Sequence, residues 1–207
     1  MFSNLQINRT LVKNVRMSVS DKTVSADDMQ AEWLEIQAAQ RDPAQFRALY
    51  NRYYEPIFRF IFRRTGSEEL AADICSQVFL KAMQRLGSYQ FKGVPFSAWL
   101  YRIASNEVAQ YFRQVQKNRV VSIEDANLSD VIDEMDELSD EVQREHMLKL
   151  LDDLKETDLQ LIELRFFEQR PFKEIADILN ITESNAKVKT YRILERLKKK
   201  LNKTMKD

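Results

Sequence analysis

The last 24 residues concentrate cationic side chains that could bind the phosphates of a nucleic acid. Residues 184–207 carry nine Lys or Arg and two acidic residues, although the whole 207-residue chain has 32 of each sign and is neutral. Cations on the outer face of a helix can contact phosphates along the DNA major groove. Because cations also favour the carboxyl end of any helix, the charge alone leaves an ordinary helix end as the alternative. Four of the cations fall outside the apolar stripe of the predicted helix: Lys187, Lys189, Arg192 and Arg196.

The segment that carries these cations has the pattern of a helix-turn-helix. Residues 172–179 predict a short helix, and Asn180 suits the turn after it because Asn tolerates the left-handed conformation. Thr182 is placed to cap a longer second helix. Ser184 and Asn185 lie at the amino end of that helix, where a recognition helix reads base edges. An ordinary helical hairpin remains the alternative, but turn, cap and basic outer face together favour DNA binding.

A second group of residues suits unpaired nucleic acid. The loop 87–95, GSYQFKGVP, places Tyr89, Phe91 and Lys92 between two glycines. Aromatic rings stack on bases while Lys and Arg pair with phosphates, and stacking contributes roughly 1–3 kcal/mol per base. The helix predicted after this loop adds further cations: Arg102, Arg113, Lys117 and Arg119. Packing in a helical core is the alternative for the aromatic residues, and for Trp99 and Phe96 it is the more natural one.

The elements that must position these residues are helices. The chain has only three Gly and four Pro, whereas sheet proteins need turn residues at short intervals. Apolar residues recur at helical spacing in four segments of residues 27–119 and in four shorter segments of residues 142–201. One of the latter is expected to start at a Thr157 cap. The sequence therefore predicts an all-α protein of two small helical domains.

Charge divides the chain into basic, acidic and basic parts. Residues 43–119 carry twelve basic and five acidic residues, and residues 120–141 carry nine acidic residues and no basic one. An acidic run repels phosphate and is typical of a solvated linker. We therefore expect a flexible amino-terminal arm (1–26), a first domain (27–119), a flexible acidic linker (120–144) and a second domain (145–207).

The composition argues against several classes of protein. Cys75 and His146 are the only residues of their types, which excludes an internal disulfide and makes a metal site improbable. Cys75 is expected to be packed rather than reactive. Neither a membrane span nor a secretory signal is apparent, so a cytoplasmic location is expected; Met17 and Met29 are alternative starts. We expect a protein without catalytic residues, metal, cofactor or small-molecule substrate.

The two modules together resemble the extracytoplasmic-function sigma factors, the two-domain class of the bacterial sigma-70 family. Residues 43–119 are similar to domain 2 of that family, which docks on the polymerase clamp and melts and reads the promoter −10 element. Residues 145–201 resemble domain 4, whose helix-turn-helix reads the −35 element. The implied −10 residues are Tyr89, Phe91, Lys92, Trp99, Arg102, Asn106, Arg113 and Lys117. The implied −35 residues are Thr182, Ser184, Asn185, Lys187, Val188, Lys189, Arg192 and Arg196.

The resemblance also implies a polymerase-docking helix at residues 73–83, DICSQVFLKAM. Ser76, Gln77 and Met83 depart from the usual pattern of that helix, leaving one fewer acid and no tryptophan. In the helix-turn-helix, Asn180 replaces the family's usual Gly and Ala186 its usual Val. The docking residues carried over are Asp73, Ser76, Gln77, Phe79 and Lys81.

The implied partners are the clamp and flap regions of bacterial core RNA polymerase, promoter DNA and an anti-sigma factor. A stand-alone helix-turn-helix regulator is the rival interpretation. It accounts for the second module but leaves the first without a role. A regulator would bind its promoter alone, whereas a sigma subunit requires core polymerase.

Overall fold

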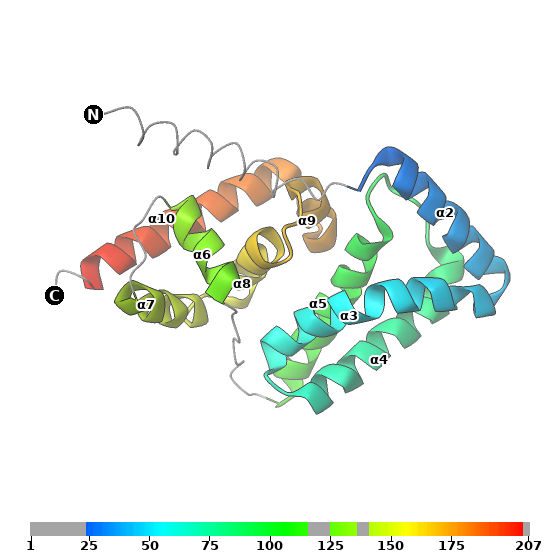
Figure 1. Ribbon diagram of the computed structural model, residues 1–207, viewed down its shortest axis with the longest axis horizontal. Helices are drawn as coiled ribbons and strands as arrows, with labels where there is room; N and C mark the ends of the chain where they lie inside the picture. The colour runs from blue at the N-terminus through cyan, green and yellow to red at the C-terminus, as the bar shows by residue number, and fades with distance from the viewer. Residues whose placement is uncertain (1–23, 116–124, 136–140, 205–207) are drawn as a thin grey trace, which may run out of the picture.

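The computed structural model describes residues 24–115, 125–135 and 141–204, which form helices joined by short connections. The described residues contain no strand, as predicted. Two bodies of helices lie side by side in Figure 1: α2 to α5 form one, and α6 to α10 form the other. We call them the amino-terminal body and the carboxyl-terminal body.

The amino-terminal body is built around the packing of three long helices. The apolar stripes of α3, α4 and α5 face one another and bury Leu49, Ile61, Val78 and Leu100 completely. These stripes are the ones that the sequence predicts. The elements are α2 (Ala26–Arg41), η1 (Pro43–Gln45), α3 (Phe46–Thr65), α4 (Glu68–Arg85), η2 (Leu86–Ser88) and α5 (Phe96–Val115).

A sharp turn between α3 and α4 sets the direction of α4. Gly66 ends α3 in the left-handed conformation (φ 63°), which glycine adopts without a steric penalty. Ser67 then caps α4, its hydroxyl accepting a hydrogen bond from the Leu70 backbone N–H at 3.3 Å. The sequence predicts Ser67 at this helix start. The two-residue connection makes α3 and α4 neighbours along their lengths.

Two polar residues of α2 hold the loop between η2 and α5. The carboxylate of Glu32 is buried; it accepts a hydrogen bond from the Phe96 backbone N–H at 2.9 Å and another from the Tyr53 hydroxyl. Gln40 donates from Nε2 to the backbone oxygens of Leu86 (2.9 Å) and Tyr89 (3.0 Å). Helix α2 thus fixes both ends of the loop that carries the aromatic residues.

The carboxyl-terminal body includes part of the segment expected to be a flexible linker. Helix α6 buries Leu128, Val131 and Ile132 against its neighbours, and Met135, which follows the helix, is buried with them, so the linker prediction is corrected for residues 125–135. Acidic residues alternate there with apolar ones at helical spacing, which gives the helix one apolar face. The elements are α6 (Asp125–Glu134), α7 (Glu141–Asp152), α8 (Glu156–Ile162), η3 (Glu163–Phe167), α9 (Phe172–Leu179) and α10 (Glu183–Thr204).

The helix predicted to run on from Thr157 changes its winding at residue 163. Helix α8 begins at Glu156 with Lys155 as its cap, so Thr157 lies inside the helix and the predicted cap is wrong. The next five residues form a π-helical turn, η3, in which Glu163, Leu164, Phe166 and Phe167 are all buried. The wider turn lets consecutive side chains pack in different directions, and such turns often occur at functional positions.

Cys75 lies fully inside the amino-terminal body, where burial raises its pKa from 9.0 to about 12. Only the thiolate reacts with alkylating reagents, and three pKa units remove about three orders of magnitude of it near pH 8. We therefore expect iodoacetamide to label the native protein about a thousandfold more slowly than the urea-unfolded protein, with mass spectrometry as the readout. Equal rates in the two states would contradict the buried placement.

Candidate nucleic-acid interface

The amino-terminal half of α10 forms a polar and cationic face, positioned by a tight turn. Asn180 ends α9 in the left-handed conformation (φ 54°), as predicted. The Asn185 backbone N–H donates to the Thr182 hydroxyl at 3.2 Å, so Thr182 caps α10. The inward stripe predicted for this helix is buried: Ala186, Thr190, Ile193, Leu194, Leu197 and Leu201. The residues predicted to contact duplex DNA are exposed: Thr182, Ser184, Asn185, Lys187, Val188, Lys189, Arg192 and Arg196.

Three members of this face differ in what they offer a ligand. Val188 is 45% exposed, so an apolar side chain lies among the polar ones and could contact a thymine methyl group. Lys187 forms an exposed ion pair with Glu183 at 2.8 Å, which contributes little and leaves the cation accessible. Arg196 pairs with Asp158 of α8 at 2.5 Å, and this bond ties α10 to the rest of the body.

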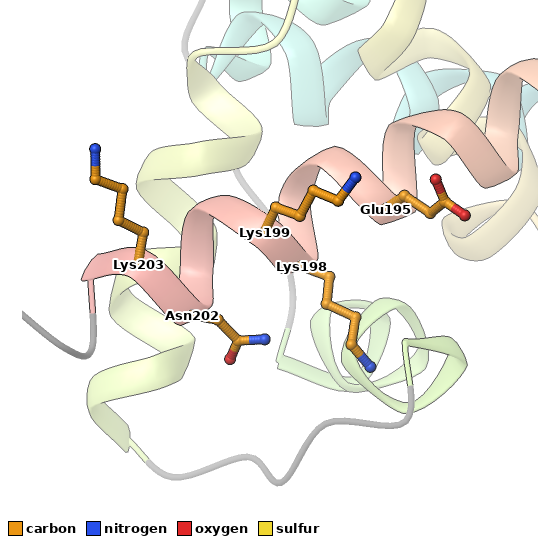
Figure 2. Close-up of a pocket in the computed structure, with 5 residues that line it drawn as sticks. All are labelled: Glu195, Lys198, Lys199, Asn202 and Lys203. Atoms are coloured by element: carbon orange, nitrogen blue, oxygen red, sulfur yellow. The ribbon is translucent and has the colours of Figure 1, made fainter.

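A second cationic cluster lies at the carboxyl half of the same helix. Figure 2 shows Lys198 and Lys203 projecting to opposite sides of α10, with Lys199, Asn202 and Glu195 around the same open pocket. The Lys198 ammonium donates to the backbone oxygen of Met135 at the end of α6 (2.8 Å). Lys198 therefore joins α10 to α6.

A partly open cavity of about 220 Å³ lies between the loop 87–95, α5, the carboxyl end of α4 and α9, with Tyr89 and Trp99 in its lining. Tyr89 packs with its ring centroid 4.8 Å from that of Trp99 and 5.2 Å from that of Phe96. Burial raises the pKa of Tyr89, with the negative charges of Glu32 and Asp177 adding to the effect, so its hydroxyl stays protonated. Arg85, Lys92 and Arg102 also line the cavity. We call this site the aromatic cleft.

The predicted −10 residues do not all face the aromatic cleft. Phe91 lies at its margin and stacks on Trp33 with centroids 6.2 Å apart. Asn106 and Arg113 are exposed farther along α5, where the Arg113 Nε donates to the Ala109 oxygen. Lys117 lies outside the described residues. The loop turns sharply at Gly93, whose φ of 70° favours glycine.

Helix α4 presents an exposed face to solvent. Asp73, Ser76 and Gln77 lie on it, as the docking prediction requires. Phe79 does not: it is 3% exposed and packs against Tyr50 (4.8 Å between centroids), so its role is to position the helix. The Lys81 ammonium pairs with Glu107 of α5 at 2.5 Å.

Two apolar residues of this face are not among the docking residues predicted from the sequence. Leu80 is 48% exposed and lies one helical turn beyond Ser76, and Met83 is 47% exposed and lies one further turn along the same helix. Solvent-facing apolar residues in the middle of a long helix are typical of a protein-binding surface. The signal in the sequence was weak, because Met83 appears there only as a departure from the family pattern. We call Asp73, Ser76, Gln77, Leu80 and Met83 the α4 face.

The described part of the chain contains neither a helix that could span a membrane nor a group of residues that could bind a metal ion. Every helix in residues 24–115, 125–135 and 141–204 is too short or too polar to cross a bilayer. The same residues contain no cluster of His, Cys, Asp and Glu that could hold a metal ion.

Comparison with known families matches both bodies. Residues 49–118 match the family described as Sigma-70 region 2, and residues 150–199 match Sigma-70, region 4. The RNA polymerase sigma factor YlaC of Bacillus subtilis is 30% identical over 159 residues, which cover 75% of this chain and 91% of that protein. The ECF RNA polymerase sigma factor BldN of Streptomyces coelicolor is 29% identical over 178 residues, covering 84% of this chain and 67% of that protein.

Solved structures share the fold. The structure of CnrH in complex with the cytosolic domain of CnrY matches with a TM-score of 0.56 at 18% identity, covering 82% of this chain and 95% of that chain. The sigma factor RpoE of Bartonella quintana, solved with the anti-sigma factor NepR, matches with a TM-score of 0.53 at 21% identity, covering 76% and 96%. At these identities, both similarities show only that the helices are arranged in the same fold.

Proposed function

Because this chain belongs to the extracytoplasmic-function group of the sigma-70 family of bacterial RNA polymerase sigma factors, we propose a role in initiation for each of its surfaces. The amino-terminal half of α10 reads the −35 element of promoter duplex. The aromatic cleft and α5 melt and hold the −10 element. The α4 face docks on the clamp of core polymerase, and the carboxyl-terminal body contacts the flap region.

The observation that carries the duplex-binding role is the segregation of α10 into two faces. The side chains of the inward stripe are buried in the core, whereas Ser184, Lys187 and Arg192 are exposed on the amino-terminal half of the helix. The capped end and its dipole favour negative charge, and the side chains there supply both cations for phosphates and polar groups for base edges. This is the chemistry that a major-groove recognition helix needs.

The role in holding unpaired DNA is supported by the composition of the aromatic cleft. Tyr89 and Trp99 provide ring faces, and Lys92 and Arg102 provide cations within the same cavity. Unpaired bases stack on such rings while their phosphates pair with the cations. Asn106 and Arg113 extend the polar surface along α5.

A stand-alone regulator is the less favoured alternative. It would need the helix-turn-helix of the carboxyl-terminal body and nothing else, whereas both sigma-70 regions are matched in this chain. Sigma factors are initiation subunits without catalytic activity of their own, and we extend this to the present protein. We further propose a cytoplasmic location and an anti-sigma partner, since the related fold of RpoE was solved bound to one.

In vitro transcription tests the proposal directly. Purified protein added to bacterial core RNA polymerase on fragmented genomic DNA should produce transcripts that start at a small set of positions, which sequencing of the 5′ ends identifies. The control omits the protein and should give no defined starts. Promoter binding by the protein alone, with no change in polymerase start sites, would favour the stand-alone regulator.

A further inference from the structure

Helix α2 contacts the loop of the aromatic cleft at both ends, although it lies outside the part of the chain that matches the sigma-70 family. The residues that match Sigma-70 region 2 begin at residue 49, whereas α2 spans Ala26–Arg41. The helix packs against α3 and η2 at one edge of the amino-terminal body (Figure 1). Three of its side chains reach the loop or the amino end of α5.

Glu32 places a buried carboxylate at the amino end of α5. Its Oε2 accepts a hydrogen bond from the Phe96 backbone N–H at 2.9 Å, and its Oε1 accepts one from the Tyr53 hydroxyl. Burial, together with the negative charge of Glu32, raises the pKa of Tyr53, so that hydroxyl keeps its proton and donates. Phe96 is the first residue of α5, where backbone N–H groups lack partners within the helix and the dipole favours negative charge. Glu32 therefore caps α5 from another helix.

Gln40 holds the other end of the loop, about two turns further along α2. Its Nε2 donates to the backbone oxygens of Leu86 at 2.9 Å and Tyr89 at 3.0 Å. Both bonds require a donor, and only an amide or a cation of this reach can supply it. A carboxylate in the same place would accept and not donate, so it would repel the two oxygens.

The ring of Trp33 supports the aromatic side chains of the loop. Its centroid lies 6.1 Å from that of Tyr89 and 6.2 Å from that of Phe91, and the Phe91 ring is stacked on it with 25° between the planes. Phe91 is 36% exposed, so part of its ring remains available to a base. Helix α2 thus contacts both aromatic residues of the loop.

A loop that distinguishes bases has to be held in one geometry before the bases arrive. Binding groups need to stay within about 0.5 Å of the productive arrangement, which depends on neighbours that lock them in place. Ordering a loose loop during binding costs affinity. Gln40 and Trp33 restrain the backbone and the ring of Tyr89, and Glu32 fixes where α5 begins.

We propose that α2 is part of the −10 site and that Glu32 and Gln40 are positioning residues, which hold the loop 87–95 and the amino end of α5 in the geometry that reads unpaired bases. Neither residue touches the DNA; both act through the backbone of the elements that do. The inference rests on the proposed role of the aromatic cleft in binding unpaired DNA.

The near-isosteric change Gln40→Glu tests the inference in the full-length protein assembled with core polymerase. Fluorescence anisotropy measures the affinity for a short single-stranded DNA that carries the mapped −10 element. The variant should bind about tenfold more weakly, the factor that corresponds to one lost hydrogen bond. The control Gln37→Glu adds the same charge three residues earlier on α2 and should stay within about twofold of the parent.

The second readout is base discrimination, which a merely structural role would not change. The affinity is measured again with one base of the −10 element replaced, and the ratio of the two affinities is compared between proteins. Gln40→Glu should lower this ratio, because a misplaced loop loses contacts to bases while the cations still pair with phosphates. Gln37→Glu should keep the ratio of the parent.

Substitutions of Glu32 test the other end of the loop. Glu32→Ala should also lose about tenfold in affinity. Glu32→Gln should recover most of it, because the amide oxygen can accept from the Phe96 N–H and the amide nitrogen can donate to the Tyr53 hydroxyl. The control Glu35→Ala removes a carboxylate of the same helix that pairs with Arg52 at 2.8 Å, and it should bind as the parent does.

Urea unfolding and affinity for core polymerase are measured for every variant, and Gln40→Glu carries the test if Glu32→Ala does not fold. Equal affinities in Gln40→Glu and Gln37→Glu, a weaker affinity with an unchanged ratio, or no recovery in Glu32→Gln would overturn the inference. A parent protein that shows no preference for the −10 sequence would instead contradict the proposed function, so the two failures are distinguishable.

Discussion

Replacing Lys187, Lys189 and Arg192 together with alanine is expected to weaken binding to −35 duplex by two to three orders of magnitude at about 0.1 M salt. Each phosphate contact releases counterions and contributes about 0.9 to the slope of log K against log salt concentration, so three contacts contribute about 2.7. The three side chains are exposed on the amino-terminal half of α10, away from its buried stripe. Their loss should therefore leave the fold intact.

Binding of the polymerase holoenzyme to a duplex that carries the mapped −35 element is measured by fluorescence anisotropy at a series of salt concentrations. A matched control removes three cations from the other end of the same helix: Lys199, Lys200 and Lys203 to alanine. The control should retain most of the affinity and of the slope. If both triple variants lose the same slope, the amino end of α10 is not the duplex-binding face.

Leu80→Asp is expected to lower the affinity for core polymerase by about 100-fold or more while leaving the fold intact. The side chain is 48% exposed, so the free energy of unfolding should change by no more than about 0.5 kcal/mol. In the docked state, the new carboxylate would be buried in an apolar contact without a partner, which is costly. The variant thus separates docking from stability.

Leu34→Asp provides the matched control for this change. Leu34 is 60% exposed on α2 of the same body, so the substitution adds the same charge to another face. Binding to core polymerase is measured by surface plasmon resonance, and unfolding by urea titration. Normal binding of Leu80→Asp, or an equal loss in the two variants, would exclude the α4 face as the docking surface.

The secondary structure of the amino-terminal body could be predicted well because its signals are local. Ser67 caps α4, and the apolar residues at helical spacing are those that the three long helices bury. Helix periodicity and capping depend on neighbours within one or two turns, so they can be read without the fold. The same holds for Asn180 and Thr182, whose turn and cap the structure confirms.

The predictions that failed depend on contacts between distant segments. Acidity favoured a solvated linker at residues 125–135, but the apolar face of α6 packs against η3 and α7 within the carboxyl-terminal body. Thr157 looked like a cap, yet α8 begins one residue earlier and changes to a π-turn at Glu163, whose carboxylate faces Arg64. Phe79 matched the docking pattern of the family, but the sequence alone does not distinguish a phenylalanine that docks on a partner from one that packs in the core.

The sequence by itself determined that the chain is helical, that it has two modules with the residues of a sigma factor, and which end of α10 is polar. These properties follow from spacing and side-chain chemistry along one helix or turn. Only the tertiary structure decided that Glu32 and Gln40 hold the aromatic loop, that Leu80 and Met83 face solvent, and that Asp177 meets Arg102. Each of these depends on which surfaces come together when helices far apart in the chain pack, and no local pattern encodes that choice.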